Sequence, residues 1–470
     1  MCYTFCVVFF DMNKRSKIAI LGFGIEGQAV LSYLTKHDYT NITICDQNVD
    51  IKDSLPRGVS ASLGQKYLDG LDKFDVIFRS PGIKYFDPHI QVAKVRGVEV
   101  SSAANFFIDQ CPGIIIGVTG TKGKGTTCTL IYEMLKKSGK KADKDVFLGG
   151  NIGKCPIEFL DKVKIKNIVI LELSSFQLQD LAKSPHYAIL LNTTSDHLDY
   201  HVDKEEYLAA KEQMLIHQNK NCTAVINKDY EYSKYYTPLV KGKLKFVSVK
   251  GHVKDGAFVE DESIFYAKNG KKEKIVKVSE AALVGSHNLE NILPAVVIAK
   301  EFKVKNSDIA HVIGTFKGLP YRLEFVRELK GVKFYNDSNS TIPETSMAAV
   351  DSFNAPTVLI AGGSDKGADY DEWALKILTK PSLHTVILIG QIADKMEKAL
   401  VDAENKLGDA LGSPTKILRR KTLEEAVLDG YAESEKGGVV VMSPAAASFD
   451  MFKNYKERGN EFNAHVRKLS

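Results

Sequence analysis

The sequence predicts an α/β protein made of three doubly wound domains in series: a Rossmann-like N-terminal domain, a central P-loop domain and a Rossmann-like C-terminal domain. Apolar, β-branched runs that stop at glycines recur along the chain, and segments of helical periodicity separate them. This alternation is typical of parallel sheets covered by helices. The chain of 470 residues is also too long for one hydrophobic core, so about three domains are expected.

Composition places the chain among ordinary globular proteins, with 44% hydrophobic and 26% charged residues. The net charge of +5 is spread without a long basic block, so nucleic-acid binding is not predicted. The 7 cysteines are scattered and form no CxxC pair, which favours a reducing cytoplasm and cysteines used as small core residues. The apolar stretch 2–10 is too short to span a bilayer, and basic residues follow it, the wrong order for a secretory signal. We expect no membrane segment, and Met12 is an alternative start.

The N-terminal domain, expected over residues 1–111, opens with a dinucleotide-type βαβ unit. A buried strand from Ile18 runs into Gly22-x-Gly24-x-x-Gly27, and a helix follows to about Thr35. A second strand ends at Asp46, an acid at about the distance expected for a ribose contact. By itself the glycine pattern predicts only a phosphate-bearing ligand. Further strands are expected at 74–78, which ends in Ser80-Pro-Gly82, and at 98–100.

The central domain, expected over residues 112–317, begins with a second glycine-rich turn. The buried run 114–119 ends at Gly120, and a helical segment follows. Glycines let backbone N–H groups approach phosphate oxygens, the helix N-terminus favours anions, and Lys124 can neutralise a terminal phosphate. The spacing is shorter than the common P-loop, and Gly125 stands where a hydroxyl normally meets Mg²⁺, which leaves Thr126 or Thr127 to supply it. The alternative is an ordinary strand–helix turn.

Polar side chains lie where three central segments end. Glu172 lies near the end of the buried run 167–173, where open α/β sheets bind ligands and where a buried carboxylate needs a partner or a metal. His197, in the loop after strand 187–192, fits a metal ligand and a surface or capping histidine about equally well. Asn151 is the polar side chain of the glycine-rich loop 149–153.

The helix that begins near Asp203 places Tyr207, Lys211 and Leu215 on one face. Asp203 is expected to cap it, with Glu206 completing a capping box. A lysine on a solvated helix is usually only charge, and a bare ammonium would repel Mg²⁺. A carbamate formed with CO₂ would reverse that sign, although the sequence alone does not justify one. The segment 230–277 is expected to be β-rich and peripheral, and a helix is expected at 292–299.

The C-terminal domain, expected over residues 318–470, holds a third set of strands at 332–338, 357–363, 385–390 and 438–444. Arg322, Asp337 and Lys366 are each ordinary surface charges when taken singly. Their shared position beside glycines and strand ends favours a ligand site. The small residues that follow Ser443 permit close backbone approach, and simple tight packing explains them equally well.

Six motifs in order make the chain, from Ile18 to its C-terminus, resemble the Mur ligase family. They are Leu171-Glu-Leu-Ser-Ser-Phe-Gln-Leu178, Asp196-His197, Ala209-Ala-Lys211, Gly285-Ser-His-Asn288 with Asn291, Gly318-Leu-Pro-Tyr-Arg322, and Ser443-Pro-Ala-Ala-Ala-Ser448 with Arg458-Gly-Asn-Glu-Phe462. Two positions depart from the family pattern. Gly125 replaces a hydroxyl residue, as in folylpolyglutamate synthases, and Asn339 stands where the family usually has a lysine.

The resemblance implies a monomeric cytoplasmic ligase that joins D-glutamate to UDP-N-acetylmuramoyl-L-alanine, using ATP and two Mg²⁺ ions, in peptidoglycan precursor synthesis. It implies catalytic roles for Lys124, His197 and carbamoylated Lys211, and metal ligation by Thr126, Glu172, His197 and Lys211. It implies ATP contacts from Gly120, Thr121, Lys122, Gly123, Lys124, Gly125, Thr126, Asn288, Asn291, Arg322 and Asp337. It implies substrate contacts from Gly22, Gly24, Asp46, Ser80, Asn151, Thr341, Lys366, Ser448, Phe449 and Tyr455.

Three other functions compete with this one. A folylpolyglutamate synthase or another amino-acid-adding Mur enzyme shares the central motifs, but the folate enzymes lack a UDP-binding first domain. An NAD(P)-dependent oxidoreductase would explain Gly22-x-Gly24-x-x-Gly27 and Asp46, but it leaves the phosphate loop and Glu172 without a role. A non-catalytic ATP-binding regulator is disfavoured by the intact set Lys124, Glu172, His197 and Lys211.

Overall fold

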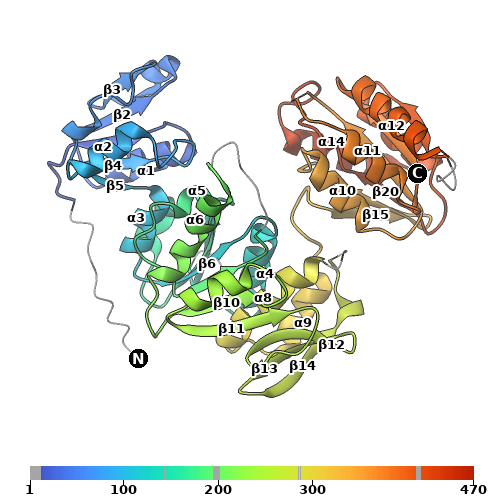
Figure 1. Cartoon of the computed structure of the whole chain (residues 1–470), viewed down its shortest axis with the longest axis horizontal. Helices are drawn as coiled ribbons and strands as arrows, with labels where there is room; N and C mark the ends of the chain where they lie inside the picture. The colour runs from blue at the N-terminus through green and yellow to red at the C-terminus, as the bar shows by residue number, and fades with distance from the viewer. Residues whose placement is uncertain are drawn as a thin grey trace. The chain divides into compact units, whose positions relative to one another are not determined.

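The computed structural model describes residues 12–141, 144–193, 202–283, 285, 287–365, 367–408 and 414–470. The chain forms two compact units. The large unit comprises the residues up to Glu280 together with Leu289–Ile313, and the small unit comprises Ala281–Asn288 and Gly314–Ser470. Figure 1 shows three α/β regions in series along the chain, each built around its own sheet, as the sequence predicts.

The first sheet is parallel throughout, in the order β3-β2-β1-β4-β5. Alternate residues of β1 face opposite sides, where Ile18 and Ile20 pack with one helix layer and Ala19 and Leu21 with the other. Its strands are β1 (Ile18–Leu21), β2 (Ile42–Asp46), β3 (Ser60–Leu63), β4 (Val76–Arg79) and β5 (Glu99–Ser101), and its helices are α1 (Ile25–Lys36), α2 (Pro88–Val95) and α3 (Ala103–Gln110).

The second sheet has the order β14-β13-β12-β11-β10-β9-β6-β8-β7, antiparallel only in the hairpins that join β12, β13 and β14. Its strands are β6 (Ile114–Thr119), β7 (Val146–Gly150), β8 (Ile168–Glu172), β9 (Tyr187–Leu190), β10 (Thr223–Asn227), β11 (Lys243–Ser248), β12 (Gly256–Glu260), β13 (Ser263–Lys268) and β14 (Lys271–Lys277). The associated helices are α4 (Lys124–Lys137), α5 (Ser175–Leu178), α6 (Lys204–Ile216), α7 (Ser233–Tyr236), α8 (His287–Glu301) and α9 (Asn306–Thr315).

One continuous hydrophobic core serves both sheets of the large unit. It runs from Ile18 in β1 through Phe106 and Phe107 in α3 to Leu171 in β8. The aromatic ring of Phe159 joins the two sides, 5.4 Å between ring centroids from Phe107 and 5.4 Å from Phe147. Because these layers share buried side chains, we expect them to hold a fixed mutual geometry.

The third sheet, in the small unit, has the order β15-β16-β20-β17-β18-β19, and only β15 is antiparallel to its neighbour. Its two faces are covered by α10–α12 and by α13–α14. The strands are β15 (Glu324–Leu329), β16 (Val332–Asn336), β17 (Thr357–Gly362), β18 (Leu383–Ile389), β19 (Lys416–Arg419) and β20 (Val439–Met442). The helices are α10 (Pro343–Asp351), α11 (Asp371–Leu378), α12 (Ala393–Leu407), α13 (Leu423–Ala432) and α14 (Tyr455–Lys468).

Two local predictions were wrong. Asp203 caps α6 by accepting a hydrogen bond from the Glu206 N–H, but the Glu206 carboxylate accepts from the Val202 N–H instead of closing the predicted box. Helix α8 begins five residues before the predicted Ile292 and extends to Glu301, with Pro294 inside it. The apolar run predicted only part of this helix, because His287, Asn288, Glu290 and Asn291 interrupt the apolar pattern before Ile292.

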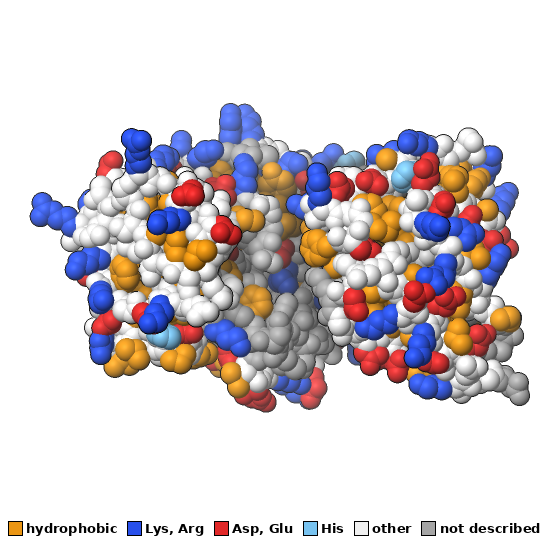
Figure 2. All heavy atoms as spheres, turned by 90° about the horizontal axis from the view of Figure 1, so that it is seen from above, with side chains coloured by type: hydrophobic (Ala, Val, Ile, Leu, Met, Phe, Trp, Pro, Cys, Tyr) orange, Lys and Arg blue, Asp and Glu red, His pale blue; other side chains and the backbone are white. Residues whose placement is uncertain are grey.

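Two further predictions were confirmed for the described residues. The β-rich segment forms β11 to β14, and the five cysteines in the described ranges are all buried and free. Within those ranges no helix is both long and apolar enough to cross a membrane. On the face shown in Figure 2, basic and acidic side chains of the small unit are interspersed, as the even spread of charge in the sequence suggests.

Candidate active site

The glycine-rich loop 120–123 connects β6 to α4 in the middle of the second sheet, where β6 has β8 on one side and β9 on the other. Gly123 adopts φ +84°, which favours glycine, and an added Cβ would lie 2.0 Å from Asn291 Oδ1, so a larger residue would displace the Asn291 side chain. The Lys124 ammonium donates to the carbonyls of Gly120 and Thr121 at 3.0 and 2.9 Å. The loop therefore holds its lysine close to its own backbone, at the N-terminus of a 14-residue helix.

Lys211 lies beneath this loop and is 1% exposed. Its ammonium is 3.5 Å from both Thr119 Oγ1 and the Gly120 carbonyl, and 4.3 Å from the centre of the Tyr207 ring. Tyr207, Lys211 and Leu215 are all buried on the predicted common face of α6. Lys211 thus packs against the phosphate loop and is not a solvated surface charge.

Glu172 ends β8, next to β6, and is 6% exposed. One of its carboxylate oxygens accepts a 3.1 Å hydrogen bond from the Asn151 side-chain amide, and the Asn151 N–H donates to the Glu172 carbonyl at 2.8 Å. The predicted metal ligand and the predicted substrate contact are therefore neighbours. An oxygen donor of this kind suits Mg²⁺.

The two threonines after Gly125 face different surroundings. Thr127 is fully buried, and its hydroxyl donates to the Asn291 carbonyl at 3.3 Å. Thr126 is only partly buried. Of the two residues that the sequence offered as the missing hydroxyl, Thr126 is the one on the accessible side.

The predicted substrate residues of the first sheet cluster at its switch point, between β1 and β4. The Ser80 hydroxyl donates to the Gly22 carbonyl at 3.0 Å, so the loops after these two strands are joined. Asp46 accepts hydrogen bonds from the N–H groups of Phe23 and Asn48, both at 2.7 Å. A Cβ on Gly27 would lie 2.0 Å from the Gly22 carbonyl oxygen, which explains the third glycine. Ligands bind at such switch points in open α/β sheets.

Two family models match the chain: the "Mur ligase MurD-like, N-terminal domain" over residues 16–102 and the "Mur ligase middle domain" over residues 118–299. A UDP-N-acetylmuramoylalanine–D-glutamate ligase of Acetivibrio thermocellus is 40% identical over 462 residues, covering 97% of each chain. A protein of the same name from Clostridium tetani is 36% identical, covering 98% of each. The chain belongs to the Mur ligase family.

Solved Mur ligases share the fold of this one at low sequence identity. The MurF ligase of Thermotoga maritima, in complex with ADP, has a TM-score of 0.56 at 19% identity and covers 97% of both chains. The UDP-N-acetylmuramate–alanine ligase MurC of the same organism has a TM-score of 0.56 at 18% identity, covering 96% of this chain and 99% of that chain.

In the small unit of this Mur ligase, Asp337 follows β16 and Ser443 follows the neighbouring β20. Asp337 is 8% exposed and accepts hydrogen bonds from the Ser443 hydroxyl at 2.7 Å and the Leu323 N–H at 3.1 Å. Burial raises the pKa of Asp337 to about 7, although these donors and the Arg322 charge pull it down. Arg322 itself is exposed, and Asn288 is buried.

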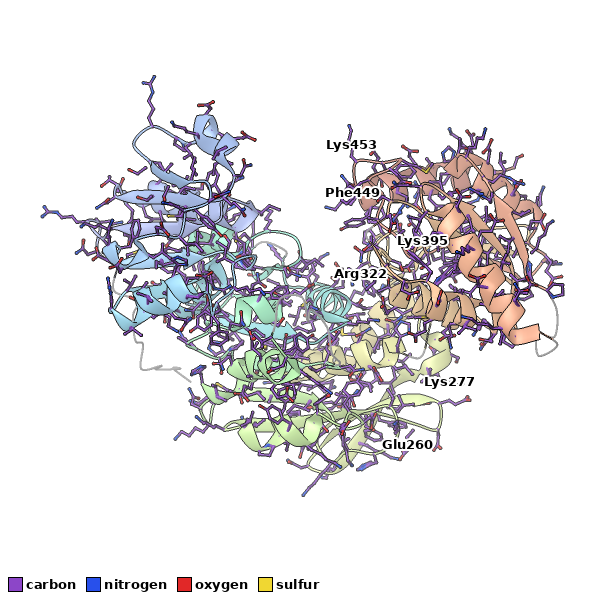
Figure 3. All side chains as sticks on the ribbon, turned by 45° about the horizontal axis from the view of Figure 1, so that its top comes forward. Glu260, Lys277, Arg322, Lys395, Phe449 and Lys453 are labelled. Atoms are coloured by element: carbon purple, nitrogen blue, oxygen red, sulfur yellow. The ribbon has the colours of Figure 1, made fainter. Side chains whose placement is uncertain are left out.

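The loops after β16 and β20 also carry the predicted amino-acid contacts. Ser448 is 2% exposed, Phe449 is 66% exposed, and Thr341 and Tyr455 are partly buried. The Ser338 hydroxyl donates to the Tyr455 carbonyl at 2.7 Å, which joins the two loops. Figure 3 shows Arg322, Phe449 and Lys453 along one side of the small unit. His197 and Lys366 lie outside the described residues.

Three residues help to build these sites although the sequence assigns them no functional role. The Tyr207 hydroxyl is 2.8 Å from Thr121 Oγ1 and so ties α6 to the phosphate loop. Arg458 is 1% exposed, and its guanidinium donates to Ser338 and to the carbonyls of Ala446 and Ala447. The third residue is Arg79, which ends β4 and is 1% exposed. The sequence places Tyr207 four residues before Lys211 on one helix face and Arg458 at the start of a family motif, whereas Arg79 belongs to no motif.

Proposed function

We propose that this Mur ligase joins D-glutamate to the L-alanyl carboxyl group of UDP-N-acetylmuramoyl-L-alanine at the expense of ATP, in peptidoglycan precursor synthesis. The observation that carries the proposal is the phosphate loop with Lys124 above a buried Lys211, beside the buried carboxylate of Glu172. The identity of the amino acid rests on the full-length relatives that bear this activity in their names.

The loop N–H groups from Gly120 to Thr126, with Lys122 and Lys124, are proposed to receive the ATP phosphates. Backbone donors at a helix N-terminus and a lysine beside them lower the cost of gathering negative charge in one place. Four further residues are proposed to contact the remainder of the nucleotide: Asn288, Asn291, Arg322 and Asp337. Of these, Asn291 lies against Gly123 of the loop.

Glu172, Thr126, His197 and Lys211 are the proposed ligands for two Mg²⁺ ions. The donor set fits, because Glu172 and Thr126 offer oxygen atoms and a carbamate on Lys211 would offer two more. Bound Mg²⁺ would offset the charge of crowded phosphate oxygens.

Substrate binding is proposed at the first sheet and at the small unit. Gly22, Gly24, Asp46 and Ser80 would hold the uridine diphosphate portion, with Asn151 further along the same molecule. Thr341, Lys366, Ser448, Phe449 and Tyr455 would receive D-glutamate. Asn339, at the position of a family lysine, removes one cation from this second group.

The proposed reaction has two steps. The substrate carboxylate attacks the γ-phosphate of ATP, giving an acyl phosphate and ADP, and the D-glutamate amine attacks the acyl carbon and expels phosphate. Lys124 stabilises charge on the transferring group. We propose that the enzyme works as a cytoplasmic monomer.

An amino-acid panel tests this function. Purified protein with ATP, Mg²⁺ and UDP-N-acetylmuramoyl-L-alanine is expected to release phosphate with D-glutamate and to do so far more slowly with L-glutamate, L-lysine or diaminopimelate. Equal release with L-lysine or L-glutamate would reject the assigned specificity. A folate substrate that supports release would favour the folylpolyglutamate-type alternative, and NAD(P)H oxidation without ATP would favour the oxidoreductase.

A further inference from the structure

Arg79 ends β4 immediately before the predicted substrate residue Ser80, yet its side chain is turned entirely inward. The residue is 1% exposed. We propose that Arg79 is a positioning residue that fixes the loop 80–83 of the first sheet against the segment that follows Glu172 in the second sheet. The inference rests on the proposed function, in which the first sheet delivers the nucleotide-sugar carboxyl group to the phosphate loop.

The Arg79 guanidinium divides its hydrogen bonds between the two sheets. One terminal nitrogen donates to the Ile83 carbonyl at 2.8 Å, which closes the loop 80–83 onto its own strand. The other donates to the Phe176 carbonyl of α5 at 2.7 Å, and the side chain also pairs with Asp180 at 3.2 Å. The planar fork of arginine can reach these partners together, whereas a lysine ammonium cannot.

Asp180 is buried to the same degree as its partner, with a side chain 1% exposed. Burial raises the pKa of Asp180, and the Arg79 charge and the Ser102 hydroxyl oppose that rise. Ser102, the residue that caps α3, donates to the second carboxylate oxygen at 2.9 Å. Figure 1 shows α3 beside α5. The ion pair and the Ser102 hydrogen bond therefore connect the end of β4, the segment after α5 and the start of α3.

A second set of hydrogen bonds connects the same two sheets. Gln177 of α5 donates to the Glu26 carboxylate of the Gly22–Gly27 turn at 2.6 Å and accepts from the Ser174 N–H at 3.1 Å. Ser174 is two residues beyond Glu172. The turns after β1 and β4, at the switch point of the first sheet, are therefore both hydrogen-bonded to the short segment that follows the proposed metal ligand Glu172.

Such a connection matters for a reaction between two bound groups. The rate depends steeply on the separation of the carboxylate and the γ-phosphate, and a misplacement of about 1 Å can cost about 100-fold. A buried ion pair with satisfied hydrogen bonds contributes little net stability over apolar residues, so stability alone is a weak reason for its presence. A role in fixing relative geometry explains both its burial and its partners.

The test compares an apolar replacement with a matched control. Arg79→Met combined with Asp180→Leu removes both charges together and leaves neither buried ion unpaired. Arg79→Lys with wild-type Asp180 keeps the charges but loses the fork. The control is Asp161→Asn, which removes a partly exposed ion pair from Lys36 and His37 to the segment 156–162, also between the two sheets but at the far end of α1.

We expect the double variant to melt near the wild-type temperature and to keep its KM for ATP within about twofold. Its kcat for ligation is expected to fall about tenfold or more, with Arg79→Lys in between. Hydrogen exchange is expected to accelerate in peptides covering 79–86 and 173–182. Asp161→Asn is expected to change neither kcat nor these peptides.

A double variant whose kcat stays within about twofold of wild type, or whose kcat and melting temperature fall while its KM for ATP rises, would overturn the positioning role. Wild-type protein that fails to ligate D-glutamate would instead overturn the proposed function. The hydrogen-exchange comparison would still decide whether Arg79 fixes the two segments, because it needs no substrate.

Discussion

The Ser443 hydroxyl donates a 2.7 Å hydrogen bond to Asp337, and this contact joins the ends of the neighbouring strands β16 and β20. Burial raises the pKa of Asp337 to about 7. An unfolded aspartate titrates near its ordinary pKa of 3.8, so between these two values the folded chain retains a proton that the unfolded chain has released.

We expect this difference to appear as pH-dependent stability of the small unit. Because the folded pKa is the higher one, the contribution of Asp337 is fully present below about pH 4 and is lost as pH rises to about 7. Asp337→Asn cannot ionise, so its stability relative to wild type should increase by about 1.4 kcal/mol per pH unit in that window. Urea unfolding followed by fluorescence of Trp373, the single tryptophan, measures this unit. Parallel pH profiles for both proteins would contradict the expectation.

The phosphate loop offers a steric test. Gly123→Ala would place a Cβ 2.0 Å from Asn291 Oδ1, and it would also force an alanine into a backbone conformation with φ +84°. We expect ATP-dependent ligation to fall by about 100-fold or more, because either the loop or the Asn291 side chain, both proposed to contact ATP, must shift. The matched control is Gly139→Ala, at φ +95° with nothing within 4 Å of the added Cβ, which carries the backbone strain without the collision. Equal losses in both variants would assign the effect to strain alone.

The sequence predicts the architecture well because strand ends and glycine turns leave local signals. The turn at Gly22, the loop at Gly120 and the carboxylate at Glu172 all lie at the carboxyl ends of parallel strands in the structure. These are properties of short segments, and a short β-branched run that stops at glycine is typical of a buried strand followed by a tight turn.

The contacts between segments could not be predicted in the same way. The pattern around Arg79 predicts only a strand. No neighbouring residue in the sequence indicates that Arg79 would contact Asp180, 101 positions away. Arg458 likewise lies 120 positions from Ser338. Lys211 was placed on the correct helix face, but its burial depends on the loop that packs above it. Long-range pairing of polar groups is decided by the tertiary fold, which single-sequence patterns do not encode.

The shared core of the large unit predicts how it unfolds. Phe159→Ala removes the ring that contacts both Phe107 and Phe147, and we expect a loss of about 3–5 kcal/mol in the free energy of unfolding. Hydrogen exchange should accelerate together in peptides from β1 and β6, because both strands bury side chains in this core. Phe86→Ala, at a site 56% exposed, is the control and should change stability by no more than about 0.5 kcal/mol. Acceleration in β6 alone would show that the two sheets unfold separately.

Lys211 provides a chemical test of the proposed carbamate. The residue is 1% exposed, 3.5 Å from the Gly120 carbonyl, so shortening it to alanine opens space directly beneath the phosphate loop. We expect Lys211→Ala to lose ligation by about 100-fold or more and to regain part of it when acetate or formate is added, because a small carboxylate can occupy the space and restore the negative charge. Lys204→Ala, at the partly exposed start of the same helix, should keep wild-type activity and show no response to acetate. Loss of activity without any response to added carboxylates would point to a lysine that acts as an ammonium, and a fully active Lys211→Ala would remove the residue from the mechanism.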